Sequence, residues 1–190
     1  MEDIKYFETI RCEDFEIFNL EYHNKRVANT IGLNINLQEY IYPISNELLR
    51  CKVIYNKNEI IDVLYFPYKK REINSFKIIF DDKIEYSKKY IDREKLDEHF
   101  SNKEDCDEVI FVKNGIVTDT SIANIAIYYE NSWITSKKCL LKGTTRARLI
   151  EEKKLIEKDI SLEMLKNVSQ IALMNAMIDF DIIKNHSFKV

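Results

Sequence analysis

The sequence predicts an α+β fold in which strands and helices are mixed along the chain. Short apolar or alternating runs typical of strands are joined by polar turns, and helical patterns occur singly among them. Strands and helices do not alternate regularly, so a doubly wound parallel sheet is disfavoured. With 190 residues, the chain is long enough for one domain or for two small ones.

The first part of the chain is rich in strand patterns. A helix is expected over residues 21–31, with Gly32 as its predicted stop. The polar stretch 83–89 is the predicted joint between two halves of the chain. Strands are expected over residues 6–11, 15–20, 49–55, 60–68 and 75–80, of which the last three form one group.

The second part of the chain combines hairpins with short helices. Asn114-Gly115 is a strong hairpin signal. The last residues, 184–190, are expected to form a frayed tail. Helices are expected over residues 92–100, 144–153 and 162–167. Strands are expected over residues 109–112, 124–129, 133–135 and 171–174, with a weaker one near Asp181.

Composition and charge exclude several classes of function. The net charge is only −3 and the basic residues are not gathered in a stripe, so neither nucleic acid nor an acidic membrane is an expected partner. The sequence contains no apolar run of membrane-spanning length, and its start lacks the pattern of a signal peptide, so the cytoplasm is the expected location. The four cysteines are far apart and the three histidines stand at no ligand spacing, which predicts free thiols and no metal site.

Two polar features lie close together in the sequence. Gly143, Thr144 and Thr145 stand where a predicted helix begins, and free N–H groups, hydroxyls and the helix dipole suit a phosphate there. An ordinary threonine cap is the alternative. Asp119 follows the Gly115 turn, and it can hold a protonated pyridine nitrogen or serve its own turn. Together they suit a cofactor with a ring nitrogen at one end and a phosphate at the other.

Two further features carry basic side chains. His23 and Arg26 are three residues apart and share one face of the first predicted helix. Arg26 can clamp a phosphate there, or the face can simply be solvated. Lys89 has tyrosines close by on both sides at the predicted joint. A Schiff-base lysine must be partly desolvated, and a surface lysine in a charged linker is the alternative.

Taken in order, these pieces resemble the class IV aminotransferase family. That family uses pyridoxal phosphate (PLP) and includes branched-chain and D-amino-acid aminotransferases and 4-amino-4-deoxychorismate lyase. The resemblance covers nearly the whole chain. The matching segments are F-E-T-I-R at 7–11, H-x-x-R at 23–26, K-x-x-D-R at 89–93, D-E-V-I at 107–110, GIVTDTSIAN at 115–124, LKGTTR at 141–146 and MNA at 174–176.

The resemblance implies roles for individual residues. Lys89 is the catalytic lysine that forms the Schiff base with PLP, although its neighbour Lys88 leaves the register open by one residue. Asp119 stands where the family has the glutamate that faces the pyridine nitrogen, so its shorter side chain must approach more closely or act through water. Arg11 and Arg93 are candidates for reading the substrate carboxylate. The residues expected to bind the rest of the cofactor are Arg26, Gly143, Thr144, Thr145, Asn175 and Ala176.

The resemblance also implies an architecture. The expected fold is a truncated two-domain class IV aminotransferase-like fold, as in the D-amino-acid aminotransferases. Residues 1–86 form a small α/β domain, residues 87–190 form a larger domain with a barrel-like sheet, and PLP lies between them. The family is dimeric, so a homodimer is expected.

Three functions follow from the resemblance. The first is amino transfer between an amino acid and a 2-oxo acid. The second is aminodeoxychorismate lyase activity, which releases pyruvate and 4-aminobenzoate from a chorismate-derived substrate and which the K-x-x-D-R context favours. The third is a degenerate homologue that binds PLP or a phosphorylated ligand without turnover. Three departures from the family pattern keep it open: Asp119, the missing segment before residue 7, and the short middle and C-terminus.

Overall fold

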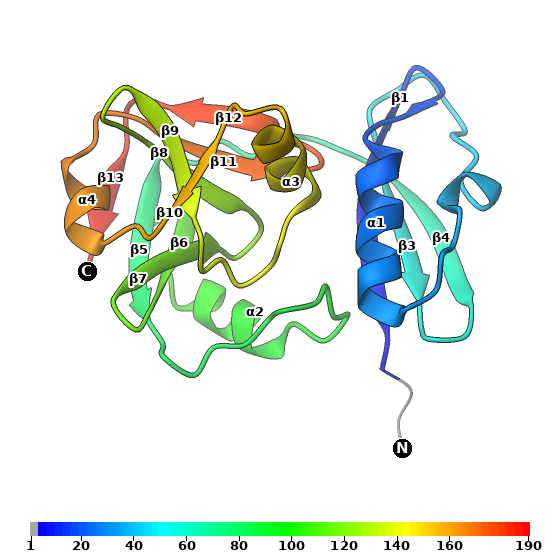
Figure 1. The fold of residues 1–190 in the computed structure, drawn as a ribbon, viewed down its shortest axis with the longest axis horizontal. Helices are drawn as coiled ribbons and strands as arrows, with labels where there is room; N and C mark the ends of the chain where they lie inside the picture. The colour runs from blue at the N-terminus through cyan, green and yellow to red at the C-terminus, as the bar shows by residue number, and fades with distance from the viewer. Residues whose placement is uncertain (1–3) are drawn as a thin grey trace. The chain divides into compact units, whose positions relative to one another are not determined.

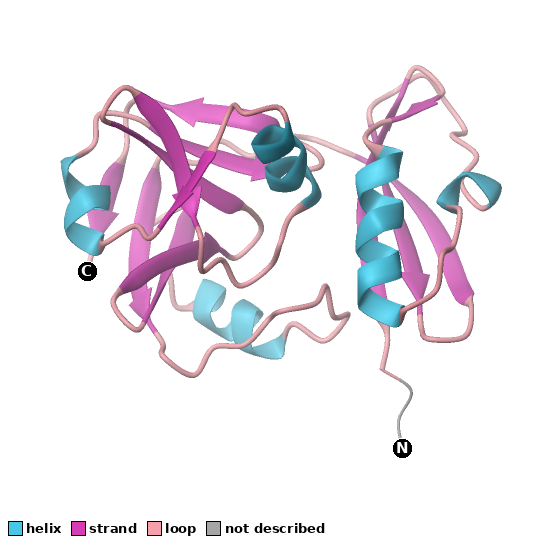
Figure 2. Cartoon of the chain, viewed as in Figure 1, coloured by secondary structure: helices cyan, strands magenta, loops and turns pink. Residues whose placement is uncertain are grey.

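A computed structural model describes residues 4–190 and divides the chain into two compact units (Figure 1). The N-terminal unit contains the chain up to Lys70 together with Lys88–Asp92. The C-terminal unit contains Arg71–Ser87 and Arg93–Val190. Both combine strands with helices, as Figure 2 shows, so the α+β prediction is confirmed. No helix in residues 4–190 is long and apolar enough to cross a bilayer.

The N-terminal unit is an antiparallel sheet with one long helix and a short 3-10 turn. The sheet order is β2-β1-β3-β4. Its elements are β1 (Tyr6–Glu13), β2 (Glu16–Ile17), α1 (Leu20–Ile31), η1 (Leu37–Glu39), β3 (Leu49–Tyr55) and β4 (Ile60–Pro67). The strand predicted over residues 15–20 is therefore mostly wrong, because only Glu16–Ile17 is a strand and a turn at residues 18–19 leads into α1.

Helix α1 ends where the sequence predicts. Gly32 adopts a left-handed conformation with φ 78°, and its N–H donates to the Ala28 carbonyl at 2.8 Å. Glycine tolerates this conformation without strain, so it satisfies a carbonyl that the helix end would leave open. The helix buries His23 and Val27 on one face, and the same unit buries Ile10 and Val53 of the sheet.

The C-terminal unit is a mixed sheet in the order β10-β9-β8-β7-β6-β5-β13, and β11 pairs with both β8 and β12. Its strands are β5 (Ser75–Phe80), β6 (Glu108–Lys113), β7 (Ile116–Thr120), β8 (Asn124–Tyr129), β9 (Ser132–Ser136), β10 (Ile156–Lys158), β11 (Ile171–Asn175), β12 (Asp179–Ile183) and β13 (Ser187–Lys189). Its helices are α2 (Glu94–Ser101), α3 (Thr144–Glu151) and α4 (Leu162–Asn167). Strand β10 was not predicted, and no range was predicted for β7, which follows the Asn114-Gly115 hairpin turn.

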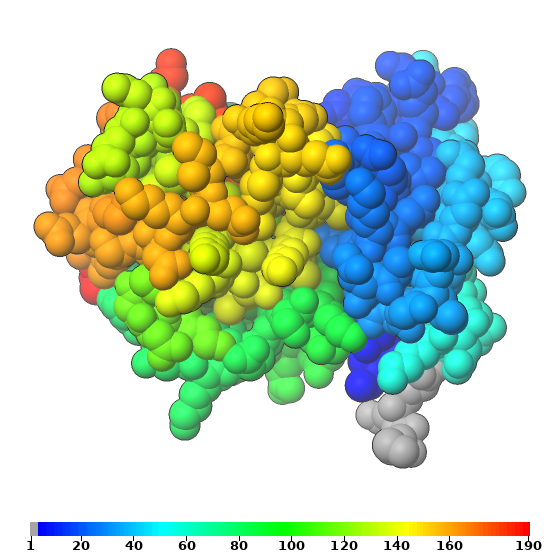
Figure 3. Space-filling model, in the orientation of Figure 1, coloured from blue at the N-terminus to red at the C-terminus, as the bar shows by residue number. Residues whose placement is uncertain are grey.

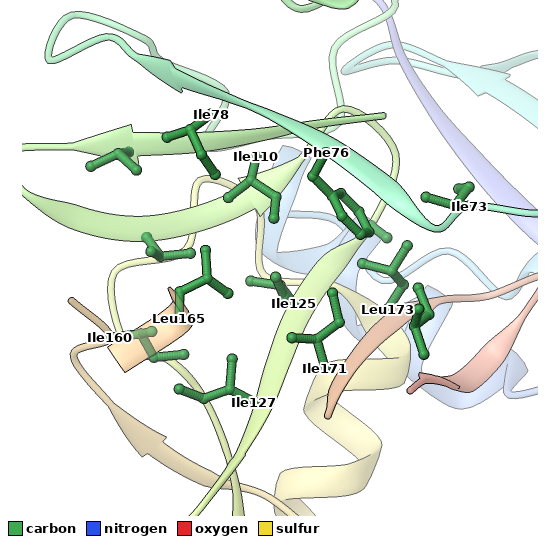
Figure 4. Packing of buried hydrophobic residues seen from close by; sticks show 14 of the residues in the cluster. Ile73, Phe76, Ile78, Ile110, Ile125, Ile127, Ile160, Leu165, Ile171 and Leu173 are labelled. Carbon is green, nitrogen blue, oxygen red and sulfur yellow. The ribbon is translucent and has the colours of Figure 1, made fainter. Parts of the chain in front are cut away.

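The core of the C-terminal unit is aliphatic. Figure 4 shows Ile125 and Ile127 of β8, Ile171 of β11 and Leu165 of α4 gathered with Ile110 of β6. All five side chains have an exposed fraction of 0%. Burying such side chains supplies most of the driving force for folding. On the face seen in Figure 3, segments coloured yellow and orange form part of the surface of this unit.

Strand β5 is placed differently from the prediction. It does not join the hairpin of β3 and β4 but pairs in parallel with β6, with Ile78 opposite Ile110. Phe76 and Ile78 are buried in the core of the C-terminal unit, and this burial explains why β5 pairs with β6. Residues 71–87 therefore belong to this unit, and the structural division differs from the expected boundary between residues 86 and 87.

The chain end is also more ordered than predicted. Strand β13 pairs in parallel with β5, and the Phe188 ring lies 6.1 Å from the Phe76 ring. The prediction of a frayed tail over residues 184–190 is wrong, because this short segment finds both a strand edge and an apolar neighbour.

Candidate functional site

A buried carboxylate organises the polar residues of the N-terminal unit. Alternation along β1 turns Glu8 to the same side as Tyr6 and Ile10, and its exposed fraction is 0%. His23 Nδ1 lies 2.6 Å from Glu8 Oε2. Arg26 donates from Nε to Oε1 at 2.8 Å and from Nη2 to Oε2. Glu8 was not predicted as a site residue, although a carboxylate at an inward position of an alternating strand was the available signal.

The surroundings of Glu8 and His23 determine which of these side chains is ionised. Burial alone would raise the pKa of Glu8, but the Arg26 charge and the hydrogen bonds from His23 and Arg26 lower it to about 2. Burial lowers the pKa of His23, against the opposing effect of Glu8. The carboxylate is therefore ionised and the imidazole neutral at pH 7. Among residues 4–190, His23 Nε2 finds no hydrogen-bond partner.

The two adjacent lysines have different surroundings. Lys88 Nζ donates to the Thr30 carbonyl at 2.7 Å, at the end of α1. Lys89 Nζ lies 4.5 Å from the centre of the Phe7 ring, and its backbone carbonyl accepts from the Phe7 N–H at 2.9 Å. The Lys89 charge also contributes to lowering the pKa of His23. Lys89 thus shares the N-terminal unit with Glu8, His23 and Arg26.

In the C-terminal unit, Asp119 is a buried carboxylate with an exposed fraction of 4%. Its Oδ1 accepts a hydrogen bond from Asn124 Nδ2, and its Oδ2 accepts from the backbone N–H groups of Leu140 and Leu141. Burial raises the pKa of Asp119 to about 6, and these donors with the Arg146 charge oppose the rise. A carboxylate accepts about four hydrogen bonds, so these three leave capacity for one more.

The start of α3 carries the second predicted feature. Gly143 precedes the helix with an ordinary φ of −68°, and Thr144 and Thr145 open it. Thr145 is 1% exposed, and its Oγ1 finds no hydrogen-bond partner within residues 4–190. The first N–H groups of a helix lack intrahelical acceptors, so this end offers donors to an anion.

The remaining predicted residues have other partners. Arg93 donates from Nη2 to the Ser121 carbonyl at 2.9 Å, within the C-terminal unit. Asn175 uses its Oδ1 to accept from the Met177 N–H at 2.9 Å, so its side chain shapes the turn that contains Ala176. If Asn175 and Ala176 contact a phosphate, they would have to do so through groups other than Asn175 Oδ1, such as the backbone of the turn.

Arg11 is separated from the Glu8 cluster. It lies on β1 at a position of opposite alternation, pairs with Glu13, and stacks 5.2 Å from the Phe18 ring. The structure therefore brings Arg26 and Lys89 together in one unit, and Asp119 with Gly143, Thr144 and Thr145 in the other.

A comparison of the sequence with models of protein families identifies the family of this chain. The model of the class IV amino-transferases matches residues 91–185. The chain belongs to the class IV aminotransferase family. Enzymes of this family depend on PLP, as the resemblance implied.

Similar proteins are known from several organisms. A Haemophilus influenzae protein of uncharacterised function is 34% identical over 183 residues, which cover 90% of this chain and 96% of that protein. A candidate aminodeoxychorismate lyase from Schizosaccharomyces pombe is 27% identical, covering 93% and 87%. The crystal structure of a candidate 4-amino-4-deoxychorismate lyase from Haemophilus somnus matches with a TM-score of 0.85 and 34% identity, covering 98% and 100%.

Each unit, taken by itself, contains polar groups of the kind that PLP requires. The unpaired Thr145 hydroxyl and the start of α3 offer donors to a phosphate. Asp119 is a buried acceptor whose ionised form a cationic ring nitrogen would favour. Arg26 is fixed by two bonds to Glu8 and carries a permanent charge. Asp119, whose side chain is shorter than the glutamate of the family, is thus a buried carboxylate.

Proposed function

We propose that this protein is a PLP-dependent 4-amino-4-deoxychorismate lyase. The observation that carries the proposal is the 34% identity, over essentially both chains, to the Haemophilus somnus candidate lyase. The Schizosaccharomyces pombe relative bears the same kind of name. Lys89 followed by Asp92 and Arg93 gives the K-x-x-D-R pattern that favours the lyase within the family.

The proposed reaction needs no further reactant. Breaking the carbon–oxygen bond to the enolpyruvyl group of 4-amino-4-deoxychorismate, and losing one ring proton, gives 4-aminobenzoate and pyruvate. Atoms and electrons balance without water, oxidant or reductant. When bound, PLP supplies an aldehyde that links to an amine and a ring that accepts electrons from the substrate.

Each residue then has a role that its surroundings support. Lys89 provides the amine that holds the cofactor and moves a proton at the substrate carbon. Asp119 holds a proton on the ring nitrogen, since an adjacent positive charge stabilises its ionised form. Arg26, Thr144 and Thr145 bind the phosphate, with backbone groups of Gly143, Asn175 and Ala176. Arg11 and Arg93 remain candidates for the substrate carboxylates.

Amino transfer is the second candidate. It is favoured by the family model, whose description is that of an amino-transferase. The same lysine and carboxylate would serve it, because moving a proton on and off the substrate carbon is common to both reactions. The difference between them is whether the substrate carries a group that can leave.

The test is a comparison of substrates. Purified protein with PLP is incubated with 4-amino-4-deoxychorismate, and 4-aminobenzoate and pyruvate are measured; parallel samples receive amino acids with 2-oxo acids. The lyase proposal expects equimolar products in the first case only. Amino transfer without pyruvate release would replace the first candidate by the second. The Lys89→Ala variant should be inactive. The Lys88→Ala variant should retain activity, because the Lys88 amine of the wild type binds the Thr30 carbonyl.

The setting of the enzyme is also a proposal. We expect a cytoplasmic homodimer. None of the four cysteines forms a disulfide, which suits a reducing compartment. Tyr42 and Ile44 are 69% and 70% exposed, and a partner subunit that covered them would remove apolar surface from water. Light scattering at micromolar concentration would show twice the mass of the chain, and a monomer would contradict this part of the proposal.

A further inference from the structure

Asn124 makes contacts in two directions within the C-terminal unit. It is 5% exposed and stands at the start of β8. Its Nδ2 donates to Asp119 Oδ1 and, at 2.8 Å, to the Leu141 carbonyl. An amide nitrogen has two hydrogens, so both are used. The side chain therefore joins β7 to the segment that leads into α3.

The oxygen of the same amide explains the glycine before α3. A Cβ added to Gly143 would lie 2.1 Å from Asn124 Oδ1, far below any tolerated contact. The φ of Gly143 is −68°, which any residue can adopt. Glycine is thus required here by the space that Asn124 occupies and not by its backbone conformation.

The segment before α3 also binds Asp119 directly. The N–H groups of Leu140 and Leu141 donate to Asp119 Oδ2. Asp119, Asn124 and Leu141 therefore form a closed ring of hydrogen bonds, and Gly143 packs against its edge. A displacement of the Asn124 amide must change both the carboxylate and the start of the helix.

We propose that Asn124 is a positioning residue that couples the Asp119 carboxylate to the phosphate-binding start of α3. This deepens the proposed function, because it rests on Asp119 and α3 taking the two ends of one cofactor. The coupling itself is a property of the protein without cofactor. It can therefore be tested whether or not the enzyme proves to be a lyase.

The charged groups around Asp119 set the reference for the test. Arg146 of α3 lowers the pKa of Asp119 by its charge. Cys139, just before the segment that binds Asp119, has its thiol pKa raised by burial and by Asp119, with Lys142 and Glu157 as further charged neighbours. None of these groups is changed in the variants below, so a shift at Asp119 reports the loss of its hydrogen-bond donor.

The experiment is a double-mutant cycle on cofactor-free protein. The Asp119 carboxyl is titrated by ¹³C NMR, with Asp119→Asn used to assign its signal. Asn124→Ala removes a donor to the ionised form and should raise the pKa of Asp119 by about one unit. Gly143→Ala should raise it by a similar amount, because the new methyl group displaces the Asn124 amide. The double variant should show the shift of one single variant and not the sum.

Controls separate coupling from general damage. Asn167→Ala in α4 removes an exposed amide that donates to the Glu163 carbonyl at 2.9 Å, and it should leave the Asp119 titration unchanged. A Gly143→Ala protein with wild-type titration of Asp119, or additive shifts in the double variant, would overturn the proposal. If Gly143→Ala alone fails to fold, Asn124→Ala should rescue it by vacating the space. A double variant that stays unfolded while Asn124→Ala folds would equally overturn it.

Discussion

Glu8 and Arg26 form a two-point ion pair inside the N-terminal unit, in which the guanidinium donates from both Nε and Nη2 to a carboxylate with an exposed fraction of 0%. Planar, two-point pairs fix the direction of an arginine more firmly than a single contact. The orientation of Arg26 therefore depends on Glu8, which contacts His23 with the same carboxylate.

Removing the charge of Glu8 tests this dependence. Glu8→Gln removes the charge that faces Arg26, whose side chain is only 13% exposed, so we expect the free energy of unfolding at pH 7 to fall by about 3 kcal/mol. Urea denaturation followed by fluorescence measures it. The matched control is Glu13→Gln, because Glu13 pairs with Arg11 and 31% of its side chain is exposed. The control should cost less than about 1 kcal/mol, and equal losses in the two variants would contradict the account.

Glu8 also predicts a dependence of stability on acid. Its pKa is lowered from an ordinary value of 4.5 to about 2 in the folded chain. The stabilisation is therefore complete above about pH 5 and is lost as pH falls toward 2, because protons bind the unfolded chain first. Unfolding free energies measured from pH 7 to pH 2.5 should fall more steeply for the wild type than for Glu8→Gln. Parallel curves would contradict the lowered pKa.

Asp119 predicts the opposite trend. Burial raises its pKa from 3.8 to about 6, so the folded chain binds the proton more tightly than the unfolded chain does. Stability from this group is present below about pH 4 and is lost as pH rises through 6, by about 3 kcal/mol in cofactor-free protein. Asp119→Asn should lack this loss between pH 4 and pH 7. The measurement is denaturation at fixed pH steps, and an unchanged pH profile would show that Asp119 titrates normally.

The orphaned hydroxyl of Thr145 separates cofactor binding from folding. Thr145→Val removes an oxygen that has no partner within residues 4–190, so stability without PLP should stay the same or rise slightly. PLP affinity, measured by absorbance titration, should fall about tenfold because a bond to phosphate is lost. The control is Thr135→Val, since Thr135 Oγ1 already donates to the Ile125 carbonyl at 2.8 Å. It should cost about 1 kcal/mol of stability and leave PLP affinity unchanged; the reverse pattern would contradict the assignment.

The chain end provides a prediction for the fold. Phe188 of β13 packs on Phe76, and β13 pairs with the edge of β5. Phe188→Ala should reduce the free energy of unfolding by about 2 kcal/mol, somewhat less than for a fully buried phenylalanine. Hydrogen exchange should show faster exchange of the β5 amides. Wild-type stability and exchange would mean that this segment frays, as the sequence alone suggests.

Local signals in the sequence predicted most single elements correctly. The Asn114-Gly115 hairpin formed as expected, with φ 49° and 75° at the two residues, and Gly32 ended α1 in a left-handed conformation. These features depend on a few neighbouring residues, so the sequence contains them directly. The Gly143-Thr144-Thr145 segment began a helix for the same reason.

Long-range pairing could not be read in this way. The partners of β5 are β6 and β13, which lie about 30 and 110 residues further along the chain and leave no local pattern. Strand β10 is three residues long and exposed, so it carries no apolar alternation. The candidate site residues show the same difference between local signals and long-range contacts. Asp119 and Thr145 were predicted from their own motifs, whereas the Glu8 pair and the Asn124 contacts depend on which residues the fold brings together.

We propose that Lys89 is the residue that holds PLP. Borohydride reduction of the PLP-loaded protein, followed by protease digestion and mass spectrometry of the peptides, tests it most directly. If Lys89 holds the cofactor, we expect loss of the visible absorption band and a reduced pyridoxyl group on Lys89 alone. A modification on Lys88 or elsewhere, or a protein that binds no PLP at saturating concentration, would contradict it.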